Sequence, residues 1–136
     1  MIQERANRVT LRDGGGFEEV AAYSRAVRIC DHLAVSGTAP MEHGVVLHPG
    51  DVYAQTRVAI EKALKAALEL GARPEDVIRT RILLAEGSDW RAAVRAYGEA
   101  FAGIEPANTT YFVAGFIPEG VLVEVELDAV LPEPPR

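Results

Sequence analysis

The stretch Val121-Leu122-Val123-Glu124-Val125-Glu126-Leu127-Asp128-Ala129 alternates apolar and acidic residues along most of its length. Successive side chains of a β-strand point to opposite faces of the sheet. Glu124, Glu126 and Asp128 therefore share one face, and the apolar residues at the alternate positions share the other. The pattern predicts a strand over residues 121–131 with one apolar and one acidic face.

Two helices are predicted before this strand. Asp51 is suited to cap a helix that runs to about Leu70, with an apolar stripe at positions 59, 60, 63, 64, 67 and 68 and with Gly71 as the stop. We expect Ser88 to cap a second helix, in which apolar or aromatic residues recur in steps of four and three at Trp90, Val94, Tyr97 and Phe101. A strand over 77–84 separates the two helices.

Shorter strands are predicted on either side of the helices. Arg8–Leu11 is expected to be an edge strand, closed by the glycine-rich turn 13–16, and residues 22–29 and 32–36 are expected to pair through a turn at Cys30-Asp31. In such a strand Tyr23 and Arg25 would share a face. Residues 41–49 are predicted to be a loop, 109–113 a further strand, and the proline-rich 132–136 a tail.

This order of elements predicts a single α+β domain over residues 1–136, with a mixed β-sheet and two helices packed on one face. The length of 136 residues and the 49% hydrophobic content suffice for one core, whereas two domains would each be too small. Two helices cover only one face of such a sheet. Because we expect the other face to include many of the valines and leucines, self-association is predicted to cover it.

Composition argues against several classes of function. The net charge is −6 and the basic residues are scattered, which disfavours nucleic-acid binding. No long apolar run or apolar leader is present, so we expect a cytoplasmic protein with no membrane partner. The three histidines and the lone Cys30 have no metal-site or nucleophile spacing, and no phosphate-binding glycine motif follows a strand. Neither a metal nor another cofactor is expected.

Three motifs carry a resemblance to a known family: Tyr23-Ser24-Arg25-Ala26-Val27, Val35-Ser36-Gly37-Thr38-Ala39-Pro40 and Pro106-Ala107-Asn108-Thr109-Thr110, followed by the alternating strand. From Tyr23 to Leu131 the chain resembles the YjgF/RidA family of small enamine and imine deaminases. The resemblance implies a chorismate-mutase-like fold, a homotrimer whose sheets form a central barrel, and three clefts between subunits that bind small molecules.

The resemblance also implies site residues. Glu124 matches the first glutamate of the family's E-I-E segment, which is thought to hold or activate a water at the imine carbon. Tyr23 matches the cleft tyrosine, and the backbone near Ser36 and Gly37 would supply donors. For Glu124 the alternative is a solvated acidic strand face, which is also the simplest reading of Glu126 and Asp128.

Asn108 stands where the family's deaminases have an arginine, which can bind a 2-imino acid's carboxylate through two parallel hydrogen bonds. Asn108 cannot form that ion pair. Arg25 is a candidate replacement, or else pairs with acidic groups. Two further features depart from the family pattern. The segment between Thr109 and Glu124 has one extra residue. Arg95 and Gly98 stand where the family frequently has an asparagine and an aromatic residue, respectively. The usual imino-acid substrate is therefore in doubt.

Three functions remain open at this point. The first is a hydrolase of a reactive imine, enamine or related carbonyl compound that uses Glu124. The second is a catalytically silent trimer that keeps the cleft as a metabolite-binding site. The third is the endoribonuclease or translation-inhibitor role attached to some relatives, which the acidic composition makes the least attractive. Fold alone does not choose among them.

Overall fold

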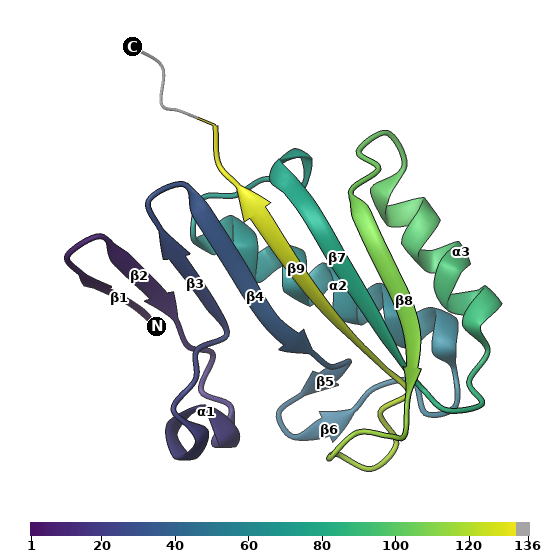
Figure 1. The fold of residues 1–136 in the computed structure, drawn as a ribbon. Helices are drawn as coiled ribbons and strands as arrows, with labels where there is room; N and C mark the ends of the chain where they lie inside the picture. Colours follow the sequence, from purple (N-terminus) through teal and green to yellow (C-terminus); the bar gives the residue numbers. More distant parts are fainter. Residues whose placement is uncertain (133–136) are drawn as a thin grey trace.

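The computed structural model describes residues 1–132 and builds them around one seven-stranded sheet (Figure 1). The strand order is β1-β2-β3-β4-β9-β7-β8, and only β7 and β8 pair in parallel. The strands are β1 (Ile2–Arg5), β2 (Arg8–Leu11), β3 (Ala26–Ile29), β4 (His32–Thr38), β7 (Val77–Ala85), β8 (Ala107–Val113) and β9 (Val123–Val130). The mixed sheet in a single α+β domain confirms the predicted fold class.

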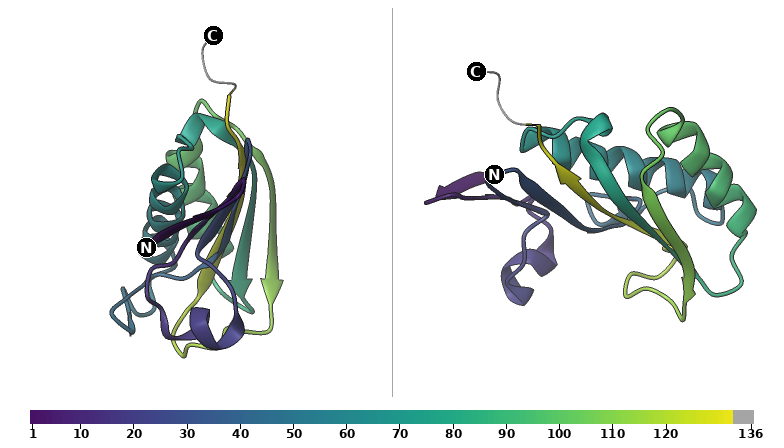
Figure 2. Two further views of the ribbon diagram at one scale, coloured as in Figure 1. Left: turned by 90° about the vertical axis from the view of Figure 1, so that its left-hand side faces the viewer. Right: turned by 45° about the horizontal axis from the view of Figure 1, so that its top comes forward.

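Two long helices, α2 (Val52–Glu69) and α3 (Trp90–Phe101), lie on one face of the sheet, and the other face is open (Figure 2). A third helix that the sequence pattern did not predict, α1 (Gly16–Ala21), lies beside one end of β3 (Figure 1). A short 3₁₀ helix, Pro74–Asp76, leads into β7. Of the predicted tail 132–136, residues 133–136 lie outside the described residues.

Strand β9 lies in the middle of the sheet and confirms the predicted alternation. Its inward residues Val123, Val125, Leu127 and Ala129 are fully buried beneath the helices, while the three carboxylates lie half-buried on the open face. The expectation that the open face holds these apolar residues is therefore wrong. They already face the helices, so they give no reason for a covering partner.

The centre of the open face is charged instead. The guanidinium of Arg81 on β7 lies 3.6 Å from a carboxylate oxygen of Glu126 and 3.6 Å from one of Asp128. These side chains are about one third exposed, so the ion pairs are solvated and contribute little to stability.

The predicted start and end of the first helix are confirmed. The Asp51 carboxylate accepts a hydrogen bond from the backbone N–H of Ala54 at 3.0 Å, and Gly71 follows the helix with a φ of +100°. The second helix differs from its prediction, because Asp89 and not Ser88 caps it by accepting from Ala92 N–H at 3.2 Å.

The apolar stripe of the second helix is rotated from the predicted one. Trp90 and Val94 are 44% and 45% exposed, and the buried residues are Ala93, Ala96 and Phe101. The small alanines face inward, and the aromatic residue at the start of α3 remains at the surface. Large apolar residues alone were therefore a poor guide to the inward face.

The N-terminal segment is more structured than predicted. Residues 2–5 pair with β2, so Arg8–Leu11 is the second strand and not the edge. The predicted strand 22–29 begins only at Ala26, because α1 ends at a left-handed Ala22 and the chain needs the next residues to turn into β3. Tyr23 and Arg25 therefore lie in the link before the strand.

The predicted loop 41–49 contains a small hairpin, β5 (Met41–Glu42) with β6 (Val45–Val46). Two-residue strands leave no recognisable period in the sequence, which is why the pattern indicated only a loop.

Strand β4 contains a β-bulge at Ser36 and Gly37. Val35 pairs with Leu127 and Thr38 pairs with Val125, so two residues of β4 lie opposite the single residue Glu126. Val35 and Thr38 both remain buried, although three positions separate them. The bulge therefore changes the direction of the backbone at Gly37 and extends the strand beyond its predicted end at Ser36.

The side chain of Gln55, in the first half of α2, joins the loops at one end of the sheet. It is fully buried, and its Nε2 donates to the carbonyls of Leu47 at 3.1 Å, His48 at 3.3 Å and Gly120 at 3.1 Å. Its Oε1 accepts from the N–H of Leu122 at 2.9 Å. One amide thus holds the segment after β6 and the segment that enters β9.

Replacing Gln55 with leucine should lower the free energy of unfolding by about 2 kcal/mol or more, because buried backbone groups lose their partner. Urea unfolding measures the change. The matched control is Gln3→Leu on the exposed strand β1, for which we expect less than about 0.5 kcal/mol. Equal effects of the two substitutions would show that the Gln55 hydrogen bonds do not stabilise this end of the fold.

Candidate functional site

The candidate site lies where the bulge of β4 meets the start of β9. A Cβ atom placed on Gly37 would lie 2.6 Å from the Glu124 Oε1, closer than real contacts of this kind. Only a glycine leaves room for the carboxylate to approach the backbone this closely. The structure therefore brings together two predicted site residues, Glu124 and Gly37.

Arg25 completes this arrangement from the link before β3. Its Nη2 donates to the Gly37 carbonyl at 2.5 Å, and its guanidinium carbon lies 6.0 Å from the centre of the Tyr23 ring. The backbone fixes the position of Arg25, because its N–H donates to the Leu11 carbonyl and its carbonyl accepts from Ser36 N–H. Tyr23, Arg25, Gly37 and Glu124 thus form one continuous cluster.

The electrostatics of the cluster are set by burial and by Arg25. Burial of the Glu124 carboxyl raises its pKa, the nearby Arg25 opposes this rise, and Glu126 adds to it. The Arg25 Nε is buried and has no hydrogen-bond partner. Glu124 therefore holds its proton to higher pH than an ordinary glutamate, as suits a group that exchanges protons with a ligand.

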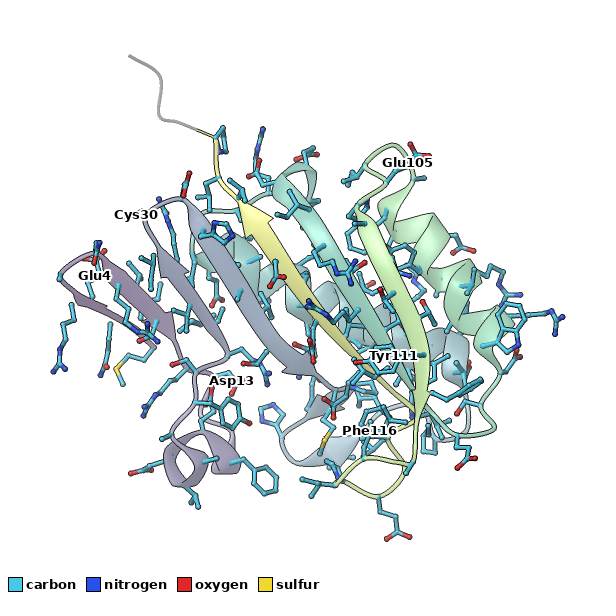
Figure 3. All side chains as sticks on the ribbon, in the orientation of Figure 1. Glu4, Asp13, Cys30, Glu105, Tyr111 and Phe116 are labelled. Atoms are coloured by element: carbon cyan, nitrogen blue, oxygen red, sulfur yellow. The ribbon has the colours of Figure 1, made fainter. Side chains whose placement is uncertain are left out.

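Asp13 is a second acidic neighbour of Arg25, at the junction of α1 and the sheet (Figure 3). Burial raises the pKa of Asp13, but hydrogen bonds from Gly15 and Glu18 and the attraction of Arg25 and Lys62 lower it overall. The charge of Arg25 is thus balanced from two sides. This supports the alternative in which Arg25 pairs with acidic groups.

Ser36 contributes differently from the other cluster residues. Its hydroxyl donates to the Ser24 carbonyl at 2.7 Å and so ties the link before β3 to the bulge. Its N–H donates to the Arg25 carbonyl and its carbonyl accepts from the Thr38 hydroxyl, so Ser36 holds the bulge in place through all of its polar groups.

Asn108 lies apart from this cluster. It pairs in parallel with Thr80, whose buried side chain faces the helices, so Asn108 faces the helical side of the sheet while Glu124 faces the open side. The Thr80 hydroxyl donates to Asn108 Oδ1 at 2.9 Å, and Asn108 Nδ2 donates to Thr110 Oγ1 at 2.8 Å. Asn108 and Glu124 therefore cannot contact one small ligand within a single chain.

The Asn108 group extends to helix α3. The hydroxyls of Tyr97 and Thr80 lie 2.7 Å apart and share a hydrogen bond. Burial raises the pKa of Tyr97, although the hydrogen bond to Thr80 lowers it somewhat. The result is a neutral chain of hydrogen bonds from α3 to the outer strand β8.

The other departures from the family pattern lie on the outside of the helices and in one loop. The Arg95 guanidinium stacks 4.4 Å from the centre of the Tyr53 ring, and Gly98 is exposed on α3. Neither belongs to the Glu124 cluster. Phe116 lies in the connection between β8 and β9, at the end of the sheet where β9 begins (Figure 3).

Some residue types supply no site. Within residues 1–132, no group of three or more His, Cys, Asp or Glu side chains is placed to hold a metal ion. Cys30 lies at the turn between β3 and β4, at the opposite end of these strands from Asp13 (Figure 3). In the same described part, no helix has the length and apolar character needed to cross a membrane.

Sequence reasoning missed several residues around the site. Gln55 carried a detectable signal, since it is a polar residue at an inward position of an otherwise apolar helical stripe. Thr80 carried a similar signal, as a polar residue in the mostly apolar β7. Asp13 carried none, because its approach to Arg25 depends on the turn before the unpredicted helix α1.

Comparison with known proteins agrees with this architecture. The family model described as Endoribonuclease L-PSP matches residues 16–131. A protein of Streptomyces coelicolor is 40% identical over 129 residues, which are 95% of each chain. A rat 2-iminobutanoate/2-iminopropanoate deaminase is 31% identical over 112 residues, with 82% of this chain and 81% of the relative covered.

A solved structure from Mycobacterium tuberculosis superposes with a TM-score of 0.82 at 36% identity, covering 91% of this chain and 99% of that one. It is described as a member of the YjgF/YER057c/UK114 family. The family model, the sequence identities and the shared fold all agree: this chain belongs to the YjgF/YER057c/UK114 family, which includes the RidA proteins.

Proposed function

We propose that this protein hydrolyses a reactive enamine, imine or related small carbonyl metabolite, with Glu124 as its proton-transferring group and without a cofactor. One observation carries the proposal: a half-buried carboxyl lies against the bare backbone of Gly37, beside the guanidinium of Arg25. The relatives named as 2-iminobutanoate/2-iminopropanoate deaminases support the same class of reaction.

The chemistry needs a group that both gives and takes protons. Hydrolysis of an imine adds water to a protonated C=N bond and forms a carbinolamine. The nitrogen of the carbinolamine must then be protonated before it leaves as ammonia. A carboxyl with a raised pKa can activate the water in one step and donate its proton in the next. Glu124 meets this requirement, and Arg25 stabilises its ionised form between the two steps.

A catalytically silent binding protein is the second candidate. The observation that favours it is the neutral, internally bonded Asn108 at the position where the resemblance implies an arginine for binding the substrate carboxylate. An endoribonuclease, as in the family model's description, finds less support, because the chain has a net charge of −6 and the open-face Arg79 and Arg81 already have partners within the fold.

The proposed assembly is a homotrimer with the ligand cleft between subunits. The outer strand β8 has an unpaired edge, and Tyr111 and Phe112 on it are 42% and 48% exposed. Asn108 and Glu124 face opposite sides of one sheet, so a cleft that contains both needs residues from two copies. The free edge of β8 and the opposite orientations of these two residues thus support association, whereas the open face is not apolar.

Light scattering at micromolar concentration should give about three times the chain mass of 14.7 kDa. The expectation follows from the exposed aromatic residues on the free edge of β8. A value near one chain mass would exclude the trimer and the cleft between subunits together.

Glu124→Gln should reduce turnover of the true substrate by about 100-fold or more, because the amide keeps the shape but has no titratable proton. Ligand binding should change little. Glu126→Gln is the matched control on the same strand and face, and it should leave turnover within a few-fold of the wild type.

Equal turnover by wild type and Glu124→Gln would remove Glu124 from the mechanism. If wild type consumes no candidate imine faster than buffer and the substitution alters affinity alone, the protein is a binding module.

Gly37→Ala should also impair turnover, by displacing the carboxylate and not the fold. The added methyl group would meet Glu124 Oε1 at 2.6 Å, and the end of a glutamate side chain can move away at low cost. Thermal unfolding should therefore change little while turnover falls. Gly98→Ala on α3, where nothing lies within 4 Å of the added atom, is the control. Full activity of Gly37→Ala would show that this contact has no role in the reaction.

A further inference from the structure

The guanidinium groups at the candidate site and on the open face already have hydrogen-bond or ion-pair partners. Arg25 donates to the Gly37 carbonyl and is attracted by Glu124 and Asp13. On the open face, Arg79 Nη2 donates to Thr109 Oγ1 at 2.9 Å, and Arg81 lies between two carboxylates. Each of these three groups already has a partner within the chain, so a ligand carboxylate would have to compete for it, whereas a free pair of donors is what a carboxylate binds most strongly.

The other half of the proposed cleft is neutral. Asn108 offers an amide, Thr110 and Tyr97 offer hydroxyls, and hydrogen bonds join these groups directly or through the buried Thr80. Burial raises the pKa of Tyr97, so its hydroxyl keeps its proton and stays uncharged at neutral pH. Groups of this kind hold hydroxyl, carbonyl or amide groups of a ligand, and they leave a ligand carboxylate without a counter-charge.

The ionised Glu124 carboxylate favours a cation over an anion at the reacting carbon. Glu124, Glu126 and Asp128 line the same face of β9, and a second negative charge from a ligand would be repelled by Glu124 once it ionises. A protonated imine carries a positive charge at the reacting carbon and nitrogen. Its approach to the Glu124 carboxylate is attractive, because the two groups carry opposite charges.

We infer that the site takes an imine or enamine with no carboxylate beside the reacting carbon, a compound that is neutral when free and cationic when protonated. The inference rests on the proposed function, in which Glu124 and Asn108 share a cleft between subunits. The reaction balances as R₂C=NH₂⁺ + H₂O → R₂C=O + NH₄⁺. Asn108 then contacts a neutral polar group of the substrate, or its uncharged end.

Two imines that differ only at one substituent test the inference. An amino-acid oxidase generates 2-iminopropanoate from alanine, and an amine oxidase generates propan-2-imine, with a methyl group in place of the carboxylate, from isopropylamine. Release of pyruvate or acetone is followed above the rate in buffer. Wild type should prefer propan-2-imine by about 10-fold or more in kcat/KM, because a carboxylate would lose its hydration in the cleft without gaining a counter-charge.

A charge-adding substitution supplies the matched comparison. Asn108→Arg should shift the preference toward 2-iminopropanoate by about 10-fold or more. Ala107→Arg adds the same charge one residue away, on the opposite face of β8, and should leave the preference unchanged. A wild type that prefers 2-iminopropanoate would overturn the inference and leave the proposed hydrolase intact.

If wild type consumes neither imine, the proposed hydrolase is overturned. A binding experiment then tests the ligand preference on its own. Isopropylamine and alanine are then titrated into labelled protein, and the amide signal of Gly37 is followed by NMR. Stronger perturbation by isopropylamine would support the same ligand preference in a binding protein. Stronger perturbation by alanine, or no response to either compound, would overturn the inference as well.

Discussion

The register of β9 is the constraint on which the rest of the structure depends. This strand lies between β4 and β7, with Val123, Val125 and Leu127 fully buried beneath the helices. A slip of one residue would turn the three carboxylates of the strand into that core, where unpaired charges are costly. The same alternation that builds the core therefore fixes which face carries Glu124, and the site inherits its geometry from the packing of the sheet.

The bulge in β4 converts this register into a site. A regular strand would have kept its inward and outward positions in step through Ser36 and Gly37, but the extra residue lets Val35 and Thr38 both point inward. The backbone at Gly37 then meets the carboxylate of Glu124 with no side chain between them. The bulge thus allows β4 to pack against the core on one side and to approach Glu124 closely on the other.

The sequence predicted the parts of the fold that repeat. The alternation of β9, the cap at Asp51 and the long strand β7 each leave a local pattern, and each was found where predicted. The hairpin of β1 with β2 and the six-residue helix α1 are too short to leave a clear period, and the bulge depends on the pairing of β4 with the distant strand β9. For the site, Glu124 and Gly37 were predicted together, but the direction in which Asn108 points required the pairing of β8 with Thr80.

That pairing explains how ligand preference can change in this fold without disturbing its acid–base group. Asn108 belongs to the hydrogen-bond chain of β8 and α3, whereas Glu124 belongs to the cluster of β4, β9 and Arg25. The two groups share no side-chain contact within the chain, so an arginine or an asparagine at position 108 leaves the surroundings of Glu124 as they are. Residues that are not in contact contribute nearly independently to binding and stability. In the proposed cleft, position 108 could therefore change the charge that meets a ligand while the contacts of Glu124 with Gly37 and Arg25 stay the same.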